Sequence, residues 1–175
     1  MDQLVKDALW QQIGAAIDYL GDTLRAYPAA LWEHRLYVTP GRPPQFAEAW
    51  YLFYHTLFWF DLYLTGTEEG YRPPAPFTLI EQTEIGPLPE RVYSPAELLE
   101  FWALARGNCR AAIEALTPES AARRCEFGWG TVSFLELLIY NLRHLQEHTA
   151  ELNLVLGQHL IATPDYPAQV RPDPA

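Results

Sequence analysis

The sequence predicts an all-α protein, an up-and-down four-helix bundle with a long irregular loop crossing between its second and third helices. Three observations support this class. Four long segments carry apolar residues with helical periodicity or are apolar throughout, proline and glycine separate these segments, and no segment alternates convincingly as a strand. A chain of 175 residues has the length of one domain with a sizeable core. We assign residues 1–160 to the bundle and 161–175 to a proline-rich C-terminal tail that we expect to be frayed.

The first two helices are defined by an apolar stripe and by helix-ending residues. The first is predicted from about Gln3 to Tyr27, before Pro28. The second is predicted from about Pro44 to Thr65, with proline in its first turn and Gly66 at its end. The stripe of the first helix repeats at three- and four-residue spacing and comprises Leu9, Ile13, Ile17, Leu20 and Leu24.

The second half of the chain begins with residues 66–93, which are rich in proline and glycine and predict the crossing loop. The stretch Ser94–Glu97 has the form of a capping box with proline at the first helical position, so the third helix runs from there to about Leu116. A short extra turn is predicted at Thr117–Ser120. The fourth helix is predicted from Thr131 or Ser133 to Gly157.

The composition excludes several classes of protein. A net charge of −10 argues against nucleic acid and against an anionic membrane surface as partners, because both attract basic surfaces. Two cysteines, Cys109 and Cys125, are too few to suggest a disulfide scaffold. The first residues lack the basic and apolar regions of a secretory signal, which predicts a cytoplasmic protein.

The second helix is apolar nearly all round, and a membrane span is the first alternative to consider. The stretch AWYLFYHTLFWFDLYL, residues 49–64, is short for a span and contains His55 and Asp61. Its aromatic residues crowd the middle, whereas spans keep Trp and Tyr to the interfaces. A buried central helix is the better interpretation, and its surplus apolar surface is available to a partner chain.

Two histidines in the fourth helix, His144 and His148, form the first candidate functional pair. In the stretch YNLRHLQEHTAELNLVLG they lie four residues apart, so both imidazoles are on one helix face and can reach one ion. Such a pair alone is common on solvent-exposed helix faces and is not specific to metal sites. A third imidazole, His55, lies mid-way along the most apolar helix, where burial without a metal or a hydrogen bond would cost free energy.

Other metal motifs fit the histidine spacing less well. HLQEH matches the inverted zinc-protease motif HxxEH, but few residues remain downstream for the further carboxylate ligand. No histidine follows a glutamate by three residues, as di-iron bundles require. His159 lies about three turns beyond His148, and His34 has no visible partner. Three neutral nitrogens with an open position match a catalytic site more closely than a structural zinc site.

The order of these motifs resembles the DinB/YfiT-like superfamily over roughly residues 3–157. The matching features are the long first helix, YHTLFWFDLYL on the second and NLRHLQEHTAELN on the fourth. The resemblance implies a four-helix bundle, often a homodimer, that holds a divalent metal, zinc or nickel, through His55, His144 and His148. Relatives of known activity include thiol-dependent S-transferases and a mycothiol-dependent maleylpyruvate isomerase, so a low-molecular-weight thiol cosubstrate is implied as well.

A metal with three neutral ligands would activate water or a thiol at neutral pH. Glu151 and Glu48 are the candidates for a general base or for a residue that orients an imidazole, and Glu147 lies farther round the helix. Two function classes stay open. One is a metal-dependent hydrolase or thiol S-transferase acting on a small molecule; the other is a non-catalytic metal-bound bundle that acts as a binding or interaction protein.

A second apolar strip on the fourth helix predicts a homodimer. It lies on the side of the helix away from the two histidines, where a monomeric bundle would present polar residues. A two-fold dimer would cover a self-complementary face of this kind, although the crossing loop could cover it instead. The strip comprises Leu135, Leu138, Ile139, Leu142 and Leu156.

Overall fold

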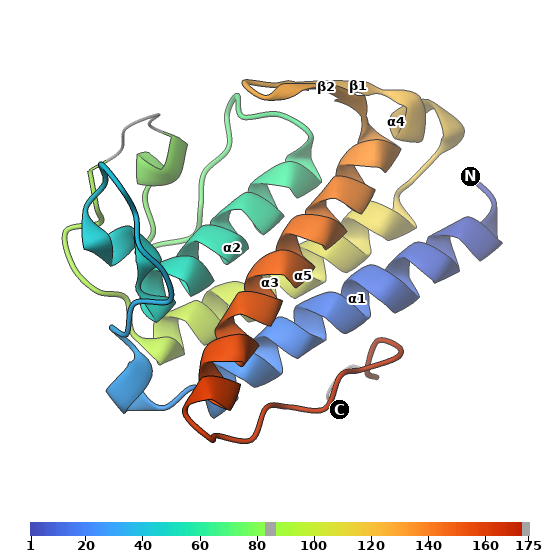
Figure 1. Cartoon of the computed structure of the whole chain (residues 1–175). Coiled ribbons are helices and arrows are strands. Elements are labelled where there is room, and N and C mark those ends of the chain that lie inside the picture. The colour runs from blue at the N-terminus through green and yellow to red at the C-terminus, as the bar shows by residue number, and fades with distance from the viewer. Residues whose placement is uncertain (83–86, 173–175) are drawn as a thin grey trace.

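The computed structural model describes residues 1–82 and 87–172, and this part of the chain is mostly helical (Figure 1). Its longest elements are three helices of twenty residues or more and the apolar central helix. The elements are α1 (Gln3–Ala26), η1 (Ala29–Leu31), η2 (Pro44–Ala47), α2 (Ala49–Thr65), η3 (Leu79–Gln82), α3 (Pro95–Glu114), α4 (Pro118–Ala122), β1 (Arg124–Phe127), β2 (Gly130–Ser133) and α5 (Phe134–Gln158).

The four long helices lie side by side, and α1 and α2 each pack against both α3 and α5 (Figure 1). Most of α2 is buried, which agrees with its interpretation as the central helix. Its aromatic rings pack in edge-to-face and stacked pairs with the rest of the core, for example Phe53 against Trp32 and Tyr54 against Phe77. In the described part of the chain no helix is long and apolar enough to cross a membrane.

The all-α prediction is only approximate, because β1 and β2 form an antiparallel hairpin before α5. Arg124 pairs with Ser133 and Phe127 pairs with Gly130. The sequence does not reveal the hairpin because each strand is only four residues long and buries few side chains, which leaves a weak alternation signal. Ser133 ends the second strand and also caps α5, together with Glu136.

The second helix begins later than predicted. Pro44 starts the short 3-10 helix η2, and Glu48 then adopts an extended conformation that separates η2 from α2. The predicted capping box at Ser94 and Glu97 is confirmed, and the predicted extra turn after Thr117 is the helix α4.

The crossing segment between α2 and α3 is packed along α2 through specific contacts. Tyr54 donates its hydroxyl hydrogen to the carbonyl of Thr78 at 3.1 Å, and Tyr71 donates to the buried carboxylate of Asp61 at 2.9 Å. Phe77 stacks on Tyr54 with ring centroids 5.8 Å apart. These contacts hold η3 beside the middle of α2.

The C-terminal tail differs from the prediction, because its described residues lie along α1 (Figure 1). The backbone N–H of Val170 donates to the carbonyl of Gln11 at 3.1 Å, and that of Arg171 donates to Asp18 at 2.8 Å. Gly14 makes room for the contact, since a Cβ there would come within 2.5 Å of the Val170 side chain. The tail up to residue 172 is therefore docked and not frayed.

Most of the apolar strip on α5 is packed against the core of the same chain. Leu138 and Leu156 are buried in the core, and Leu135 and Leu142 pack against it. Only Ile139 of this strip is exposed, at 47%. The reason is that α5 packs against both α1 and α2, so that two sides of the helix face the interior.

Candidate metal centre

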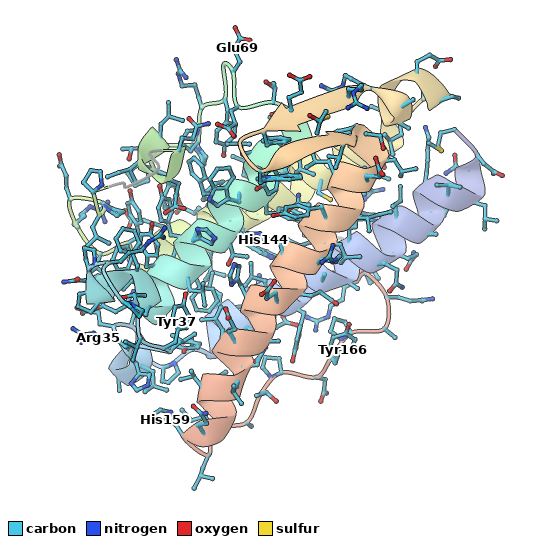
Figure 2. All side chains as sticks on the ribbon, turned by 45° about the horizontal axis from the view of Figure 1, so that its top comes forward. Arg35, Tyr37, Glu69, His144, His159 and Tyr166 are labelled. Atoms are coloured by element: carbon cyan, nitrogen blue, oxygen red, sulfur yellow. The ribbon has the colours of Figure 1, made fainter. Side chains whose placement is uncertain are left out.

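The three predicted histidines meet where α2 and α5 lie side by side. The Nε2 atom of His144 is 3.3 Å from that of His55 and 3.1 Å from that of His148. Figure 2 shows His144 between the ribbons of the two helices. The helical repeat places His144 and His148 one turn apart on the same face, and packing of α5 on α2 adds His55. In the described part of the chain these residues form the one group of three or more potential ligands close enough to hold an ion.

Two carboxylates fix the orientation of two of the imidazoles. Glu81 lies 2.7 Å from Nδ1 of His55, and Glu151 lies 2.8 Å from Nδ1 of His148. An ionised carboxylate can only accept a hydrogen bond, so each Nδ1 carries a hydrogen, and in the neutral imidazole the Nε2 atom then presents a lone pair. This is the arrangement that carboxylates give to histidine ligands of metals.

Glu81 is absent from the sequence-based candidates, and it is the more buried of the two carboxylates, with 4% of its side chain exposed. It also accepts hydrogen bonds from the hydroxyl of Tyr51 and from Nε1 of Trp59, the latter at 3.0 Å. Burial by itself would raise the pKa of Glu81, but the hydrogen bonds from His55, Tyr51 and Trp59 outweigh it and lower the pKa. Glu81 is therefore held as a carboxylate. It lies in η3, inside the irregular segment, where no periodicity could single it out.

His144, unlike Glu81, has a buried polar atom without a hydrogen-bond partner among the described residues. This atom is Nδ1 of the ring. Burial, together with the neighbouring His55 and His148, lowers the pKa of His144 to about 2, so this imidazole is neutral. Whichever nitrogen of His144 carries the hydrogen, one polar group of the cluster stays unsatisfied. A cation between the three Nε2 atoms would use all three lone pairs, which otherwise face one another, while the hydrogen of His144 stays on Nδ1.

The spacing of the donors also fits a metal ion. Zinc–nitrogen bonds of about 2.0–2.1 Å in a tetrahedral arrangement separate the nitrogens by roughly 3.3 Å. The two distances between Nε2 atoms, 3.3 and 3.1 Å, are close to that value. The distances from His144 to the other two donors thus match the separation that a small divalent ion requires.

A cavity of about 370 Å³ adjoins this cluster. His55 and His148 are part of its wall, and their side chains are 28% and 16% exposed. An ion held by the histidines would therefore be reachable by a small molecule from one side. The other lining residues come mostly from the loop before α2, from α2 itself and from η3; they are Tyr37, Thr39, Gly41, Arg42, Pro43, Phe46, Tyr51, Leu52, Trp59, Ile80 and Glu81.

Of the two predicted carboxylates, only Glu151 contacts the triad in the described part of the chain. Glu151 contacts His148, whereas the buried carboxylate of Glu48 accepts a hydrogen bond from Nε1 of Trp50 at 2.7 Å. Glu81 thus occupies the place behind His55 for which Glu48 is the sequence-based candidate. His34 and His159 lie against each other, with ring centroids 4.8 Å apart, and are not part of the triad.

Comparison with known proteins identifies the family of this chain. The family described as the DinB superfamily matches residues 12–152, which include all three histidines. The chain belongs to the DinB superfamily. Among solved structures it is similar to the crystal structure of a DinB-like protein from Bacillus subtilis, with 17% identity and a TM-score of 0.59, over 98% of this chain and 100% of that one. At this identity the likeness supports the DinB fold alone. The search of curated proteins gave no match.

Proposed function

We propose that this DinB-superfamily protein is a metal-dependent enzyme of hydrolase or thiol S-transferase type that acts on a small molecule. The observation that carries the proposal is the convergence of three Nε2 atoms, from His55, His144 and His148, beside an accessible cavity. A site that only stabilised the fold would usually be closed by a fourth protein ligand. Here the described residues supply three, and two of those three line the cavity.

A divalent ion in this position, zinc or nickel, would supply Lewis acidity and would lower the pKa of a coordinated water or thiol. The protein's own residues prepare the site. Glu81 and Glu151 hold the hydrogens of His55 and His148 on Nδ1, which keeps both Nε2 lone pairs directed at the centre. Tyr51 and Trp59 hold Glu81 in turn, so the orientation of His55 is fixed by a buried network.

Glu151 is the better candidate for moving a proton. Its side chain is 38% exposed, whereas that of Glu81 is almost fully buried. In the structure Glu151 accepts from His148, which makes it a positioning residue; a role as general base requires that it also reach the substrate in the cavity. Glu48 is engaged with Trp50 and stays a weaker candidate.

The alternative function is a non-catalytic bundle in which the ion only joins α2 to α5. The partly buried histidine cluster would favour it, because an ion there binds the three Nε2 atoms whether or not a reaction follows. The cavity beside the cluster favours the enzyme. A small-molecule substrate, a thiol cosubstrate, a cytoplasmic location and the lack of a nucleic-acid partner stay predictions.

Metal analysis and an activity screen test the proposal together. Purified protein should carry about one divalent ion per chain, and His144→Ala should lose most of it. His34→Ala is the matched control, because His34 lies outside the triad. Screens for ester hydrolysis and for thiol transfer should then show a metal-dependent activity that His144→Ala lacks. Metal content equal in the variant and the wild type would refute the assignment, and metal without activity would favour the non-catalytic alternative.

A further inference from the structure

Arg42 gives the cavity beside the metal centre a permanent positive charge. It lines the same cavity as His55 and His148, and it is the single lysine or arginine in the described lining. The remainder of the wall is largely apolar and aromatic, with Phe46, Tyr51 and Trp59 among its members. A cavity with these features offers aromatic ring faces and one permanent cation.

The backbone before Arg42 holds the residue at the cavity through a tight turn. The N–H of Arg42 donates to the carbonyl of Thr39 at 3.1 Å, and the hydroxyl of Thr39 donates to the carbonyl of Pro43 at 3.3 Å. Between them lie Pro40 and Gly41, and the φ angle of Gly41 is 75°. Proline followed by a glycine with positive φ is typical of a type II turn. The sequence TPGRPP thus fixes the position from which the Arg42 side chain extends.

No carboxylate among the described residues forms an ion pair with Arg42. Other arginines of this acidic chain do have such partners, as in the pairs Arg91–Glu97, Arg106–Asp18 and Arg171–Asp22. The carboxylates closest to the centre, Glu81 and Glu151, are engaged with histidines. The guanidinium of Arg42 is therefore available to an anion from outside the chain.

The charges around the centre favour the same kind of ligand. Glu81 and Glu151 would together offset the charge of a divalent ion, and the three imidazoles are ligands in their neutral form. With such an ion bound, Arg42 would leave the cavity with a surplus of one positive charge. A ligand with one negative charge would neutralise that surplus, whereas a neutral ligand would not.

We propose that the substrate of this site is a small organic carboxylate with a flat apolar body, bound with its carboxylate on Arg42 and its body against Phe46, Tyr51 and Trp59. This assignment rests on the proposed function for the reaction itself, but the recognition of the anion depends on Arg42. The planar guanidinium can bind a carboxylate through two parallel hydrogen bonds, which a lysine cannot do.

Titration calorimetry with a matched pair of probes tests the assignment. We would compare 2-naphthoate with its neutral amide, 2-naphthamide, using the full-length metal-loaded protein. Naphthoate should bind about tenfold more tightly, as expected for one charge-assisted contact. Arg42→Ala should remove this preference and leave naphthamide binding unchanged, and Arg42→Lys should recover only part of it. Arg124→Ala, on the exposed face of β1, is the control with the same change in net charge.

A carboxylate could also bind the ion directly, and Arg42→Ala separates the two modes. If the variant keeps the preference for naphthoate, or if wild-type protein does not bind naphthoate, the assignment to Arg42 is wrong. The same titrations on chelator-treated protein separate the test of anion binding by Arg42 from the test of metal-dependent activity. A preference that persists without metal and disappears in Arg42→Ala supports the anion site even if the enzyme assignment fails.

Discussion

At the scale of single residues, the centre depends on two carboxylates that differ in burial. The side chain of Glu81 is 4% exposed and accepts three hydrogen bonds, from His55, Tyr51 and Trp59. Glu151 is 38% exposed and contacts His148. Electrostatic interactions are stronger where water is excluded, so Glu81 should contribute more to the orientation and basicity of its histidine.

Replacing Glu81 with glutamine tests this difference. The Glu81→Gln variant keeps the size of the side chain but loses the charge, and we expect the metal affinity to fall by about 10- to 100-fold. Glu151→Gln should have a smaller effect, because solvent screens that carboxylate. Competition with a coloured chelator measures the affinity. Glu147→Gln is the control, because Glu147 lies on α5 like Glu151 but makes no hydrogen bond to the triad in the described part of the chain. Equal metal affinities for Glu81→Gln and Glu147→Gln would show that Glu81 does not support the site.

At the scale of secondary-structure elements, close helix packing depends on a glycine in α1. The indole of Trp102, from α3, lies directly over Gly21 and donates a hydrogen bond to the carbonyl of Ile17 at 2.7 Å. A Cβ at position 21 would come within 2.4 Å of that ring. The contact between α1 and α3 therefore requires the absence of a side chain there.

The variant Gly21→Ala is expected to be less stable despite the better helix propensity of alanine. Propensity would add about 1 kcal/mol, but displacing a packed indole costs about 1–3 kcal/mol or more. Gly107→Ala on α3 is the matched control, since a Cβ at that position would meet open space, and it should gain stability. Urea unfolding of both variants gives the comparison. An increase in the free energy of unfolding for Gly21→Ala would contradict the packing described above.

The metal centre also joins elements, because its ligands come from both α2 and α5. An ion that binds only the folded state stabilises it by mass action. A chelator should therefore lower the Tm of the wild-type protein, and the size of the shift should depend on the metal concentration. His144→Ala should melt at the lower temperature with or without chelator. A wild-type Tm that stays constant after verified metal removal would mean that the ion does not connect the helices.

At the scale of the whole molecule, the homodimer stays a prediction, and the structure leaves a smaller exposed apolar surface for its interface. The strip on α5 that suggests a dimer is mostly packed within the chain, and Ile139 is its exposed member. Trp129 at the tip of the hairpin is also exposed, at 44%, and stacks on Tyr140. These residues offer a smaller apolar surface than the sequence suggests.

Light scattering at micromolar concentration decides the oligomeric state. A homodimer would give twice the chain mass of 20.0 kDa, and Ile139→Glu should shift it toward the monomer by placing a charge in the apolar contact. Leu160→Glu, an exposed residue beyond the end of α5, is the control. A mass of one chain for the wild-type protein would exclude the dimer under these conditions.

The sequence alone determined the features that depend on local periodicity. The spacing of His144 and His148 places them on one helix face, and the apolar surroundings of His55 indicate that it needs a partner; both inferences follow from the helical repeat and from the cost of burying a polar group. The capping residues Ser94 and Glu97 defined the start of α3 for the same local reason.

Only the tertiary structure decided which groups from irregular segments complete the site. Glu81 lies in a stretch without periodicity and reaches His55 because Phe77 and Tyr71 anchor the crossing segment on α2. Arg42 lines the cavity through a turn in another loop. The path of such segments is set by contacts between residues distant in the chain, and a one-dimensional pattern does not contain them. The helices could therefore be predicted from the sequence, whereas the carboxylate behind His55 could not.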